Sequence, residues 1–214
     1  GNNSVITRTW TATDDTGNSS TYDQTITVQD TTAPTITAPA AVTVNVDAAT
    51  CEATGVALGN AIVSDNCDDD LVATNNAPAS FPLGDTTVTW TVTDDNSNTA
   101  TATQIVTVED DIAPEFSSVP ADITVECDVD TTNTANTGGS ATATDNCDNN
   151  VEITYTDSTV NGIGNNSVIT RTWTATDDSD NVSTEDQVIT VEDTTDPTIT
   201  APAAVTVNVD AATC

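Results

Sequence analysis

Short runs of alternating apolar and polar residues make up most of this chain, and none has the three-to-four-residue period of an amphipathic helix. The runs at 42–46, 86–92 and 104–108 alternate Val, Ile or Trp with Thr or Asn. This alternation is typical of strands with one buried and one wet face. Asp, Asn, Gly and Pro separate the runs, and the turn at 93–98 predicts a hairpin.

The phase of the alternation predicts which side chains form the core. We expect an inward face of Val88, Trp90, Val92, Val106 and Val108, with Thr89, Thr91 and Thr107 facing solvent. The three tryptophans, Trp10, Trp90 and Trp173, share that inward phase, which favours core anchors over exposed sugar-binding platforms. Arg8 and Arg171 share it too, which predicts pairing with a carboxylate or stacking on the neighbouring ring.

The chain also repeats itself. Residues 1–15 recur letter for letter at 164–178, and residues 31–51 recur at 194–214 with one change, so the long period is 163 residues. A weaker match of about 80 residues links the acidic, Pro-ended segments at 28–34, 108–114 and 191–197.

These periods divide the chain into modules. Two complete modules of different type are predicted at 31–110 and 111–193. Residues 1–30 match the last strands of a preceding module, and residues 194–214 match the first strand or strands of a following one. We therefore expect a segment of a longer array, whose partners are adjacent repeats of the same chain.

The composition excludes several classes of protein. The chain has 34 acidic residues against 2 basic ones and a net charge of −32, so a phosphate backbone would be repelled and nucleic acid is excluded as a partner. No run approaches the roughly 20 apolar residues of a membrane span. Without His, Lys or Met, most catalytic constellations cannot be built, and we predict that the chain is not an enzyme.

Two stretches carry a resemblance to a known family. The DNC string at 65–67 and the segment FPLGDTTVTWTVTDDNSNTATATQIVTV at 81–108 resemble the HYR (hyalin repeat) domain, in the form found in giant bacterial surface adhesins, including those of gliding bacteria. The module at 111–193 keeps DNC at 145–147 but has GIGNNS in place of FPLG. The resemblance implies an all-β fold of tandem immunoglobulin-like sandwiches forming an elongated rod, located outside the cell and serving adhesion.

Each complete module contains two cysteines, which predicts the pairs Cys51–Cys67 and Cys127–Cys147. Such a bridge closes a loop of about 15 residues and would stabilise the module by roughly 3 kcal/mol. Cys214 copies Cys51, and its partner would follow the given sequence. Free buried thiols and a zinc site are the alternatives, and the pairing fails if the two cysteines lie at opposite ends of a strand. Disulfides imply an oxidising, extracytoplasmic location.

Acidic residues recur in three places in each module: the entry link, the DNC turn and the DD turn. On the immunoglobulin-like topology that the resemblance implies, all three lie at one end of the sandwich, at the junction with the preceding module. The candidate metal ligands are Asp30, Asp110, Asp111 and Asp193 in the links, Asp65, Asp68, Asp145 and Asp148 in the DNC turns, and Asp94, Asp95, Asp177 and Asp178 in the DD turns.

Converging carboxylates repel each other, and Ca²⁺ relieves the repulsion because it takes six to eight oxygen ligands. The alternative is that Asp and Asn only cap their own turns. No EF-hand spacing is present, so the calcium hypothesis rests on the convergence.

Short Asp-Thr-Thr and Asp-Ser-Thr triplets match a bacterial O-glycosylation signal, with candidate acceptors Thr31, Thr86, Thr131, Ser158 and Thr194. N-x-S sequons occur at Asn2, Asn18, Asn165 and Asn181.

The features together predict a stalk segment of a long surface adhesin, which spaces and presents a distal tip and is stiffened by calcium and disulfides. One rival is a carbohydrate- or protein-binding module, which needs an exposed aromatic or apolar patch. The other is an accessory segment of a large secreted enzyme.

Overall fold

The computed structural model describes residues 3–207 of the chain, and every element longer than one turn is a strand. The predicted all-β fold class is confirmed. The one helical element among the described residues is a 3₁₀ turn, η1 (Thr134–Asn136). No helix in this part of the chain is long and apolar enough to cross a membrane.

The described residues form two compact units. Within residues 3–207, unit 1 comprises 3–115, 144–151 and 176–182, and unit 2 comprises 116–143, 152–175 and 183–207. The DNC and DD turns of the predicted module 111–193 thus belong to unit 1.

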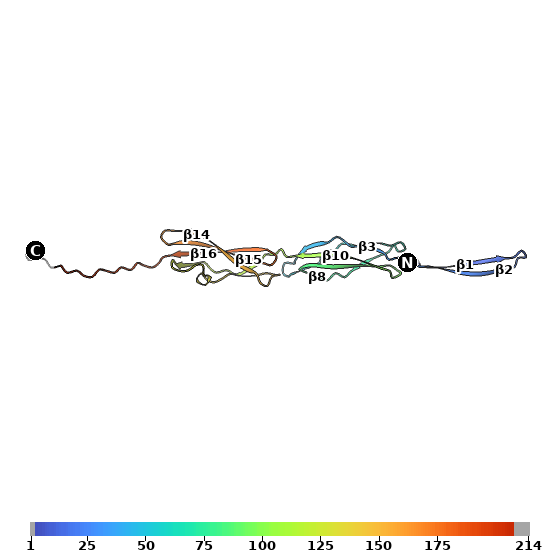
Figure 1. The fold of residues 1–214 in the computed structure, drawn as a ribbon, viewed down its shortest axis with the longest axis horizontal. Coiled ribbons are helices and arrows are strands. Elements are labelled where there is room, and N and C mark those ends of the chain that lie inside the picture. The colour runs from blue at the N-terminus through green and yellow to red at the C-terminus, as the bar shows by residue number, and fades with distance from the viewer. Residues whose placement is uncertain (1–2, 208–214) are drawn as a thin grey trace, which may run out of the picture. The chain divides into compact units, whose positions relative to one another are not determined.

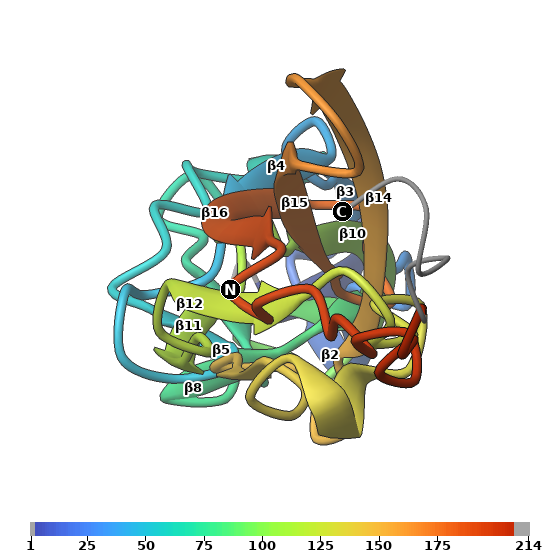
Figure 2. The ribbon, with the colours of Figure 1, turned by 90° about the vertical axis from the view of Figure 1, so that its left-hand side faces the viewer.

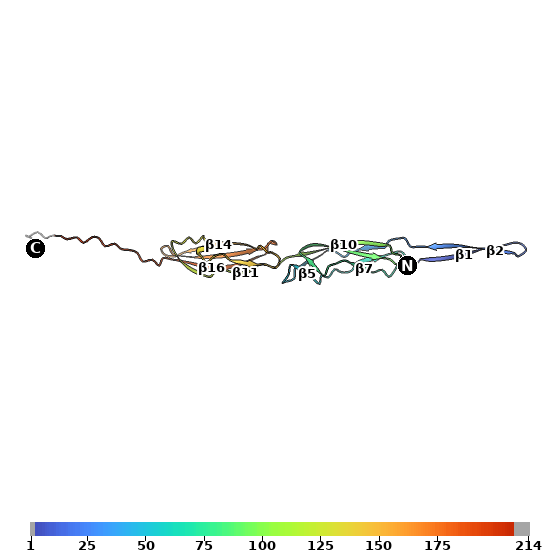
Figure 3. The ribbon, with the colours of Figure 1, turned by 90° about the horizontal axis from the view of Figure 1, so that it is seen from below.

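Unit 1 contains a hairpin and a two-layered sandwich (Figures 1 and 3). A four-stranded sheet has the order β4-β10-β9-β7, and the pairs β3-β6 and β5-β8 pack against it. The bounds are β1 (Ser4–Thr13), β2 (Ser19–Val28), β3 (Thr35–Thr37), β4 (Val42–Asn45), β5 (Glu52–Thr54), β6 (Ile62–Ser64), β7 (Ala73–Asn75), β8 (Ser80–Pro82), β9 (Gly84–Thr93) and β10 (Thr99–Glu109).

Unit 2 has a second four-stranded sheet of order β12-β16-β15-β14 (Figure 2). The strands β11 and β13 form a separate two-stranded sheet. The bounds are β11 (Glu115–Ser118), which starts at the last residue of unit 1's first segment, β12 (Ile123–Glu126), β13 (Thr142–Thr144), β14 (Glu152–Asn161), β15 (Ser167–Thr176) and β16 (Val182–Glu192). In both sheets the short early strand runs parallel to the last one: β4 along β10, and β12 along β16.

The core of unit 1 lies where the alternation predicts it. Val88, Trp90, Val92, Val106 and Val108 are all buried, and Thr89, Thr91 and Thr107 are only half-buried on the opposite face. Phe81 and Ala53 complete the core from the β5-β8 pair. The Trp90 indole N–H donates to the side-chain oxygen of Gln104 on β10 at 3.0 Å, so the polar atom of the buried ring is satisfied.

One core prediction is wrong for Trp10. The strands β1 and β15 have the same ten residues, SVITRTWTAT, yet Trp10 is 56% exposed and Trp173 only 2%. The reason is that β1 pairs only with β2, and no second layer covers this hairpin in the described structure. A sequence alternation fixes which side chains share a face, whereas burial depends on a second sheet over that face.

The predicted cysteine pairs are also wrong. Cys51 forms a disulfide with Cys147, with a Cα–Cα distance of 4.7 Å, and Cys67 and Cys127 are free. The cause is the length of β10. Cys67 lies beside Asp30, and Asp30 contacts the turn that precedes β10. Cys147 lies near Asp110, which follows the other end of β10.

A strand of 11 residues is about 35 Å long, and a disulfide needs Cα atoms less than about 7 Å apart. The paired cysteines therefore come from segments 96 residues apart in sequence that meet at one end of this strand.

Arg171 is buried, as the inward phase predicts, and both expected interactions are present. Its guanidinium donates to both carboxylate oxygens of Asp157 at 2.8 Å and lies over the Trp173 ring, 5.8 Å from its centroid. It lies closer still to a ring that the sequence did not predict, at 4.1 Å from the centroid of Tyr155. It also donates to Thr137 Oγ1 and to the Thr131 carbonyl oxygen. The paired carboxylate raises the pKa of Arg171, so this cation stays charged in the core of unit 2.

We expect Arg171→Ala to lower the free energy of unfolding by about 3 kcal/mol, because it leaves the half-buried Asp157 carboxylate without its counter-charge. Arg8→Ala is the matched control, since Arg8 has the same sequence neighbours on the exposed β1, and it should change stability by less than about 0.5 kcal/mol. Urea denaturation measures both. Equal losses in the two variants would contradict the role of Asp157.

Candidate metal centres

The DD turn between β9 and β10 is closed by its first aspartate. One carboxylate oxygen of Asp94 accepts the backbone N–H groups of Asn96 and Asn98 at 2.9 and 2.8 Å, and the other accepts the side-chain amide of Asn98 at 2.7 Å. Ser97 takes a left-handed conformation, with φ of 72°, which lets the chain reverse within these few residues. Burial acts to raise the pKa of Asp94, but the hydrogen bonds from Asn98 and Asn96 outweigh it and lower the pKa.

The same turn is built three times. Asp14 and Asp177 accept the equivalent bonds from Asn18 and Asn181, and the left-handed position is occupied by Gly17 and Asp180. At Asp14, the bonds from Asn18 and Thr16 lower the pKa to about 2. The local sequence alone is therefore enough to form the turn, whether or not other segments surround it.

In two of the three turns, the asparagine that closes the turn also contacts the acidic link. The side-chain amide of Asn181 donates to the carbonyl oxygen of Asp110 at 3.1 Å, and that of Asn98 lies 3.5 Å from the carbonyl oxygen of Asp30. These contacts bring the DD turn and the link together in both places. The sequence marks Asn181 only as an N-x-S sequon, and neither asparagine was predicted to contact the link. The signal that could have found them is their constant position, four residues after the first aspartate of each DD turn.

One acidic cluster contains Asp110, Asp145 and Asp177, all of which belong to unit 1. Each contributes one oxygen, and the three oxygens lie within 4.8 Å of one another. Asp145 is held by the N–H groups of Cys147 and Asp148, at 2.8 and 2.9 Å. Burial, and then the charges of Asp145, Asp177 and Asp111, raise the pKa of Asp110 above its usual range. The arrangement therefore concentrates negative charge that the neighbouring protein groups do not neutralise.

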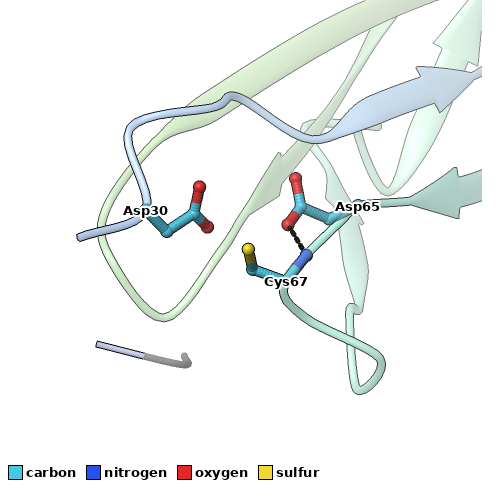
Figure 4. Close-up of side chains that lie close together, drawn as sticks. All are labelled: Asp30, Asp65 and Cys67. Carbon is cyan, nitrogen blue, oxygen red and sulfur yellow. Dashed lines mark hydrogen bonds between the residues drawn. The ribbon is translucent and has the colours of Figure 1, made fainter. Parts of the chain in front are cut away.

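A second cluster, at the entry to the unit 1 sandwich, contains Asp30, Asp65 and Cys67 (Figure 4). The Asp65 carboxylate accepts the N–H of Cys67 at 2.8 Å, the same contact that Asp145 makes with Cys147. The Cys67 thiol lies beside both carboxylates in Figure 4. Partial burial, followed by the charges of Asp30, Asp65 and Asp94, raises the pKa of this thiol.

Several carboxylate oxygens in and beside the clusters are buried without a hydrogen-bond partner. They are Asp30 Oδ2, Asp65 Oδ2, Asp145 Oδ2 and Asp148 Oδ2. Leaving a buried charged acceptor unpaired is costly, and most such atoms in proteins have a partner. A hard divalent cation would supply one, because Ca²⁺ binds carboxylate and carbonyl oxygens. These residues therefore fit calcium better than a purely turn-capping role.

The remaining acidic candidates lie outside the two clusters. Asp68 accepts the N–H of Asp95 at 3.1 Å and so joins the DNC turn to the DD turn. Asp148 accepts the N–H of Asn150 at 2.7 Å within its own turn. Asp111 is exposed and accepts from the Asn45 amide. Asp178 and Asp193 are exposed, and Asp193 caps its own turn through the N–H of Thr195.

The five candidate glycosylation sites differ in accessibility. Thr31, Ser158 and Thr194 are exposed, whereas Thr86 and Thr131 are half-buried. The Thr194 hydroxyl donates to the Glu126 carboxylate.

Comparison with known proteins agrees with the resemblance noted from the sequence. The model of the HYR domain matches residues 29–108. This stretch is therefore similar to a HYR domain. A search of curated proteins found no match.

Similar solved structures are protocadherin and immunoglobulin domains, all distant in sequence. Mouse protocadherin-24 EC1-3 is 12% identical, with a TM-score of 0.38 over 89% of this chain and 80% of its own. Protocadherin gamma B2 extracellular cadherin domains 3-6 are 13% identical, with a TM-score of 0.43 over 89% and 60%. Sidekick-1 immunoglobulin domains 1-5 are 11% identical, with a TM-score of 0.38 over 85% and 45%. At these values the likenesses say nothing about what this chain binds.

We expect Asn18→Ala to raise the pKa of Asp14 from about 2 toward 3.8, because it removes the strongest of the bonds that favour the ionised form. A folded-state pKa below the unfolded value stabilises the hairpin above about pH 4, and this contribution is lost as the pH falls through about 2. Carboxyl ¹³C NMR titration measures the value. Ser19→Ala, next in sequence, is the control, and an unshifted Asp14 in Asn18→Ala would refute the assignment.

Proposed function

We propose that this chain is a structural stalk segment of a long, repetitive surface adhesin, which spaces and presents a distal adhesive tip. The support is the combination of an exact sequence repeat, a HYR-like domain and the absence of a catalytic residue set from the composition. Length is gained by adding modules, and near-identical repeats are an economical way to add them. The modules proposed are 31–110 and 111–193, flanked by the partial modules 1–30 and 194–214.

The proposal includes calcium at both acidic clusters. Asp110, Asp145 and Asp177 would hold one ion, and Asp30 and Asp65, with Asp94 close by, would hold the other. The observations that carry this assignment are the gathering of three carboxylates within 4.8 Å in the first cluster, and of two carboxylates and the Cys67 thiol in the second. Buried carboxylate oxygens that lack any partner support both. An ion supplies the missing positive charge and the missing ligand at once.

Calcium at these positions would have a mechanical effect. Asp110 ends one sequence module, whereas Asp145 and Asp177 come from the next. An ion that binds all three would tie consecutive modules together and limit bending between them. A chain of such modules would hold its distal end away from the cell.

The proposed location is extracellular, at the surface of a bacterial cell. The Cys51–Cys147 disulfide supports it, because such bonds persist in oxidising compartments. The high negative charge would keep a long filament soluble and self-repelling. The exposed acceptors Thr31, Ser158 and Thr194 are the candidate glycosylation sites best open to modification.

Thermal melts in calcium and in EDTA test the metal sites. Extracellular calcium modules have Kd values of about 0.1 to 1 mM, so about 10 mM calcium reaches up to roughly 100 times Kd. That excess stabilises the fold by about 2.7 kcal/mol and should raise Tm by about 10 °C. The expected shift is reversed by EDTA, and magnesium should give a smaller one because it loses its water ligands reluctantly.

Variants locate the ion. Asp145→Asn should abolish most of the calcium-dependent shift, because it removes a charge from the cluster. The control is Asp186→Asn, which removes the same charge from an exposed residue that only accepts a bond from Thr172. Identical Tm values in calcium and EDTA for the unmodified chain would refute the calcium sites, and a shift abolished equally by both variants would refute their position.

A further inference from the structure

The disulfide joins parts of the chain that the sequence repeat assigns to different modules. Cys51 follows β4 in the module 31–110, and Cys147 lies in the DNC turn of the module 111–193. Cys67 and Cys127, the other two cysteines of these modules, are free. Each of the two modules therefore contributes one cysteine to this bond and has a second one whose role is unassigned.

Cys67 has the same surroundings as the bonded Cys147. The N–H of each donates to the aspartate two residues earlier, at 2.8 Å in both turns. The side-chain amide of the preceding asparagine contacts each sulfur, at 3.0 Å for Cys67 and 3.3 Å for Cys147. Each aspartate in turn lies in an acidic cluster with the link residue, Asp30 or Asp110. The DNC turn thus presents its cysteine in one fixed way, and in one of its two copies that cysteine is bonded to the preceding module.

Cys127 stands at the start of the loop that corresponds to the one carrying Cys51. The parallel pairing of Glu126 with Glu192 repeats that of Asn45 with Glu109, so Cys127 is in register with Val46. Val46 belongs to the buried cluster against which Cys147 packs. A cysteine at this position is therefore on the segment that reaches the DNC turn of a following module, and Cys127 itself is exposed.

We propose that Cys127 forms a disulfide with the Cys67 of the module that follows it, so that both kinds of junction in the array are covalently closed. The inference rests on the proposed tandem array, in which a module of the type 31–110 follows each module of the type 111–193. Residues 194–214, which copy 31–51, are the start of such a module. Every described cysteine then has a partner, and each bond connects neighbouring modules.

The bond needs an oxidant, for which a low-molecular-weight disulfide is sufficient. One protein thiolate attacks it and forms a mixed disulfide, releasing one small thiol. The second protein thiolate attacks the mixed disulfide and releases the other small thiol. The two protein thiols lose two electrons and two protons in total, and one small disulfide is reduced to two thiols.

The test extends the full chain by one partial repeat. Residues 52–110 are appended after Cys214, which completes a third module with a second copy of Cys67. The chain is folded in oxidised and reduced glutathione, free thiols are alkylated, and the bonds are mapped by mass spectrometry after non-reducing digestion at acidic residues. The expected map contains Cys51–Cys147 and a bond from Cys127 to the second copy of Cys67, with the first Cys67 alkylated.

Changing the second copy of Cys67 to serine is the control, and it should return Cys127 to the alkylated pool without disturbing Cys51–Cys147. Alkylated Cys127 in the unsubstituted extended chain would overturn the proposal. A bond between Cys214 and the second copy of Cys67 would overturn it as well, because that is pairing within one module.

The same map is made in calcium and in EDTA, beside the thermal melts. A Cys127 bond without any calcium shift in Tm would leave this inference standing and refute the metal sites. A calcium-dependent shift in Tm without the Cys127 bond would refute this inference and leave the metal sites standing.

Discussion

The hydrogen bonds that the first aspartate of each DD turn accepts are the constraint on which much of this structure depends. Two backbone N–H groups and one asparagine amide bind the Asp94 carboxylate, which fixes the reversal between β9 and β10. The reversal sets the register of the long hairpin, and that register places Trp90 and the valines on one face. The same asparagine reaches the carbonyl oxygen of the acidic link, so the turn that fixes the core also assembles the carboxylates. Fold and candidate site therefore share one local interaction.

The elements that follow from local sequence could be predicted, and those that need a distant segment could not. The alternation of apolar and polar residues at 86–92 and 104–108 was sufficient to predict these strands and their contribution to the core of unit 1, because period-2 patterning decides which residues share a face. The recurrence of the acidic turns was sufficient to nominate Asp110, Asp145 and Asp177. Burial of Trp10 and the choice of cysteine partners were predicted wrongly, since each depends on what lies across the fold. Two cysteines 16 residues apart in sequence are separated by the length of β10, whereas two that are 96 apart are bonded.

The two kinds of module stabilise equivalent core positions by different chemistry. Where unit 1 has Val88 packed against apolar neighbours, unit 2 has Arg171, which binds Asp157, Thr137 and Thr131 and stacks on Tyr155. An ion pair of this kind has demanding geometry and tolerates few alternative packings, whereas a valine core tolerates many. The glutamine on the next strand keeps one role and loses another. Gln104 and Gln187 each donate to two backbone carbonyl oxygens, but only Gln104 also accepts the N–H of the tryptophan on the neighbouring strand. Two sequences thus reach one topology with different polar interiors.

The parallel pairing of β4 with β10 determines how the unit 1 sandwich carries tension. Tension applied through the chain pulls β4 from its start and β10 from its end, so the two strands are drawn in opposite directions along a common axis. Their ladder, from Val42 opposite Val106 to Asn45 opposite Glu109, is then sheared lengthwise, and its bonds must break together rather than one after another as in an unzipping hairpin. The β12–β16 pair repeats the arrangement. Resistance to stretching is thereby built into the strand order itself, independently of any ion or covalent cross-link.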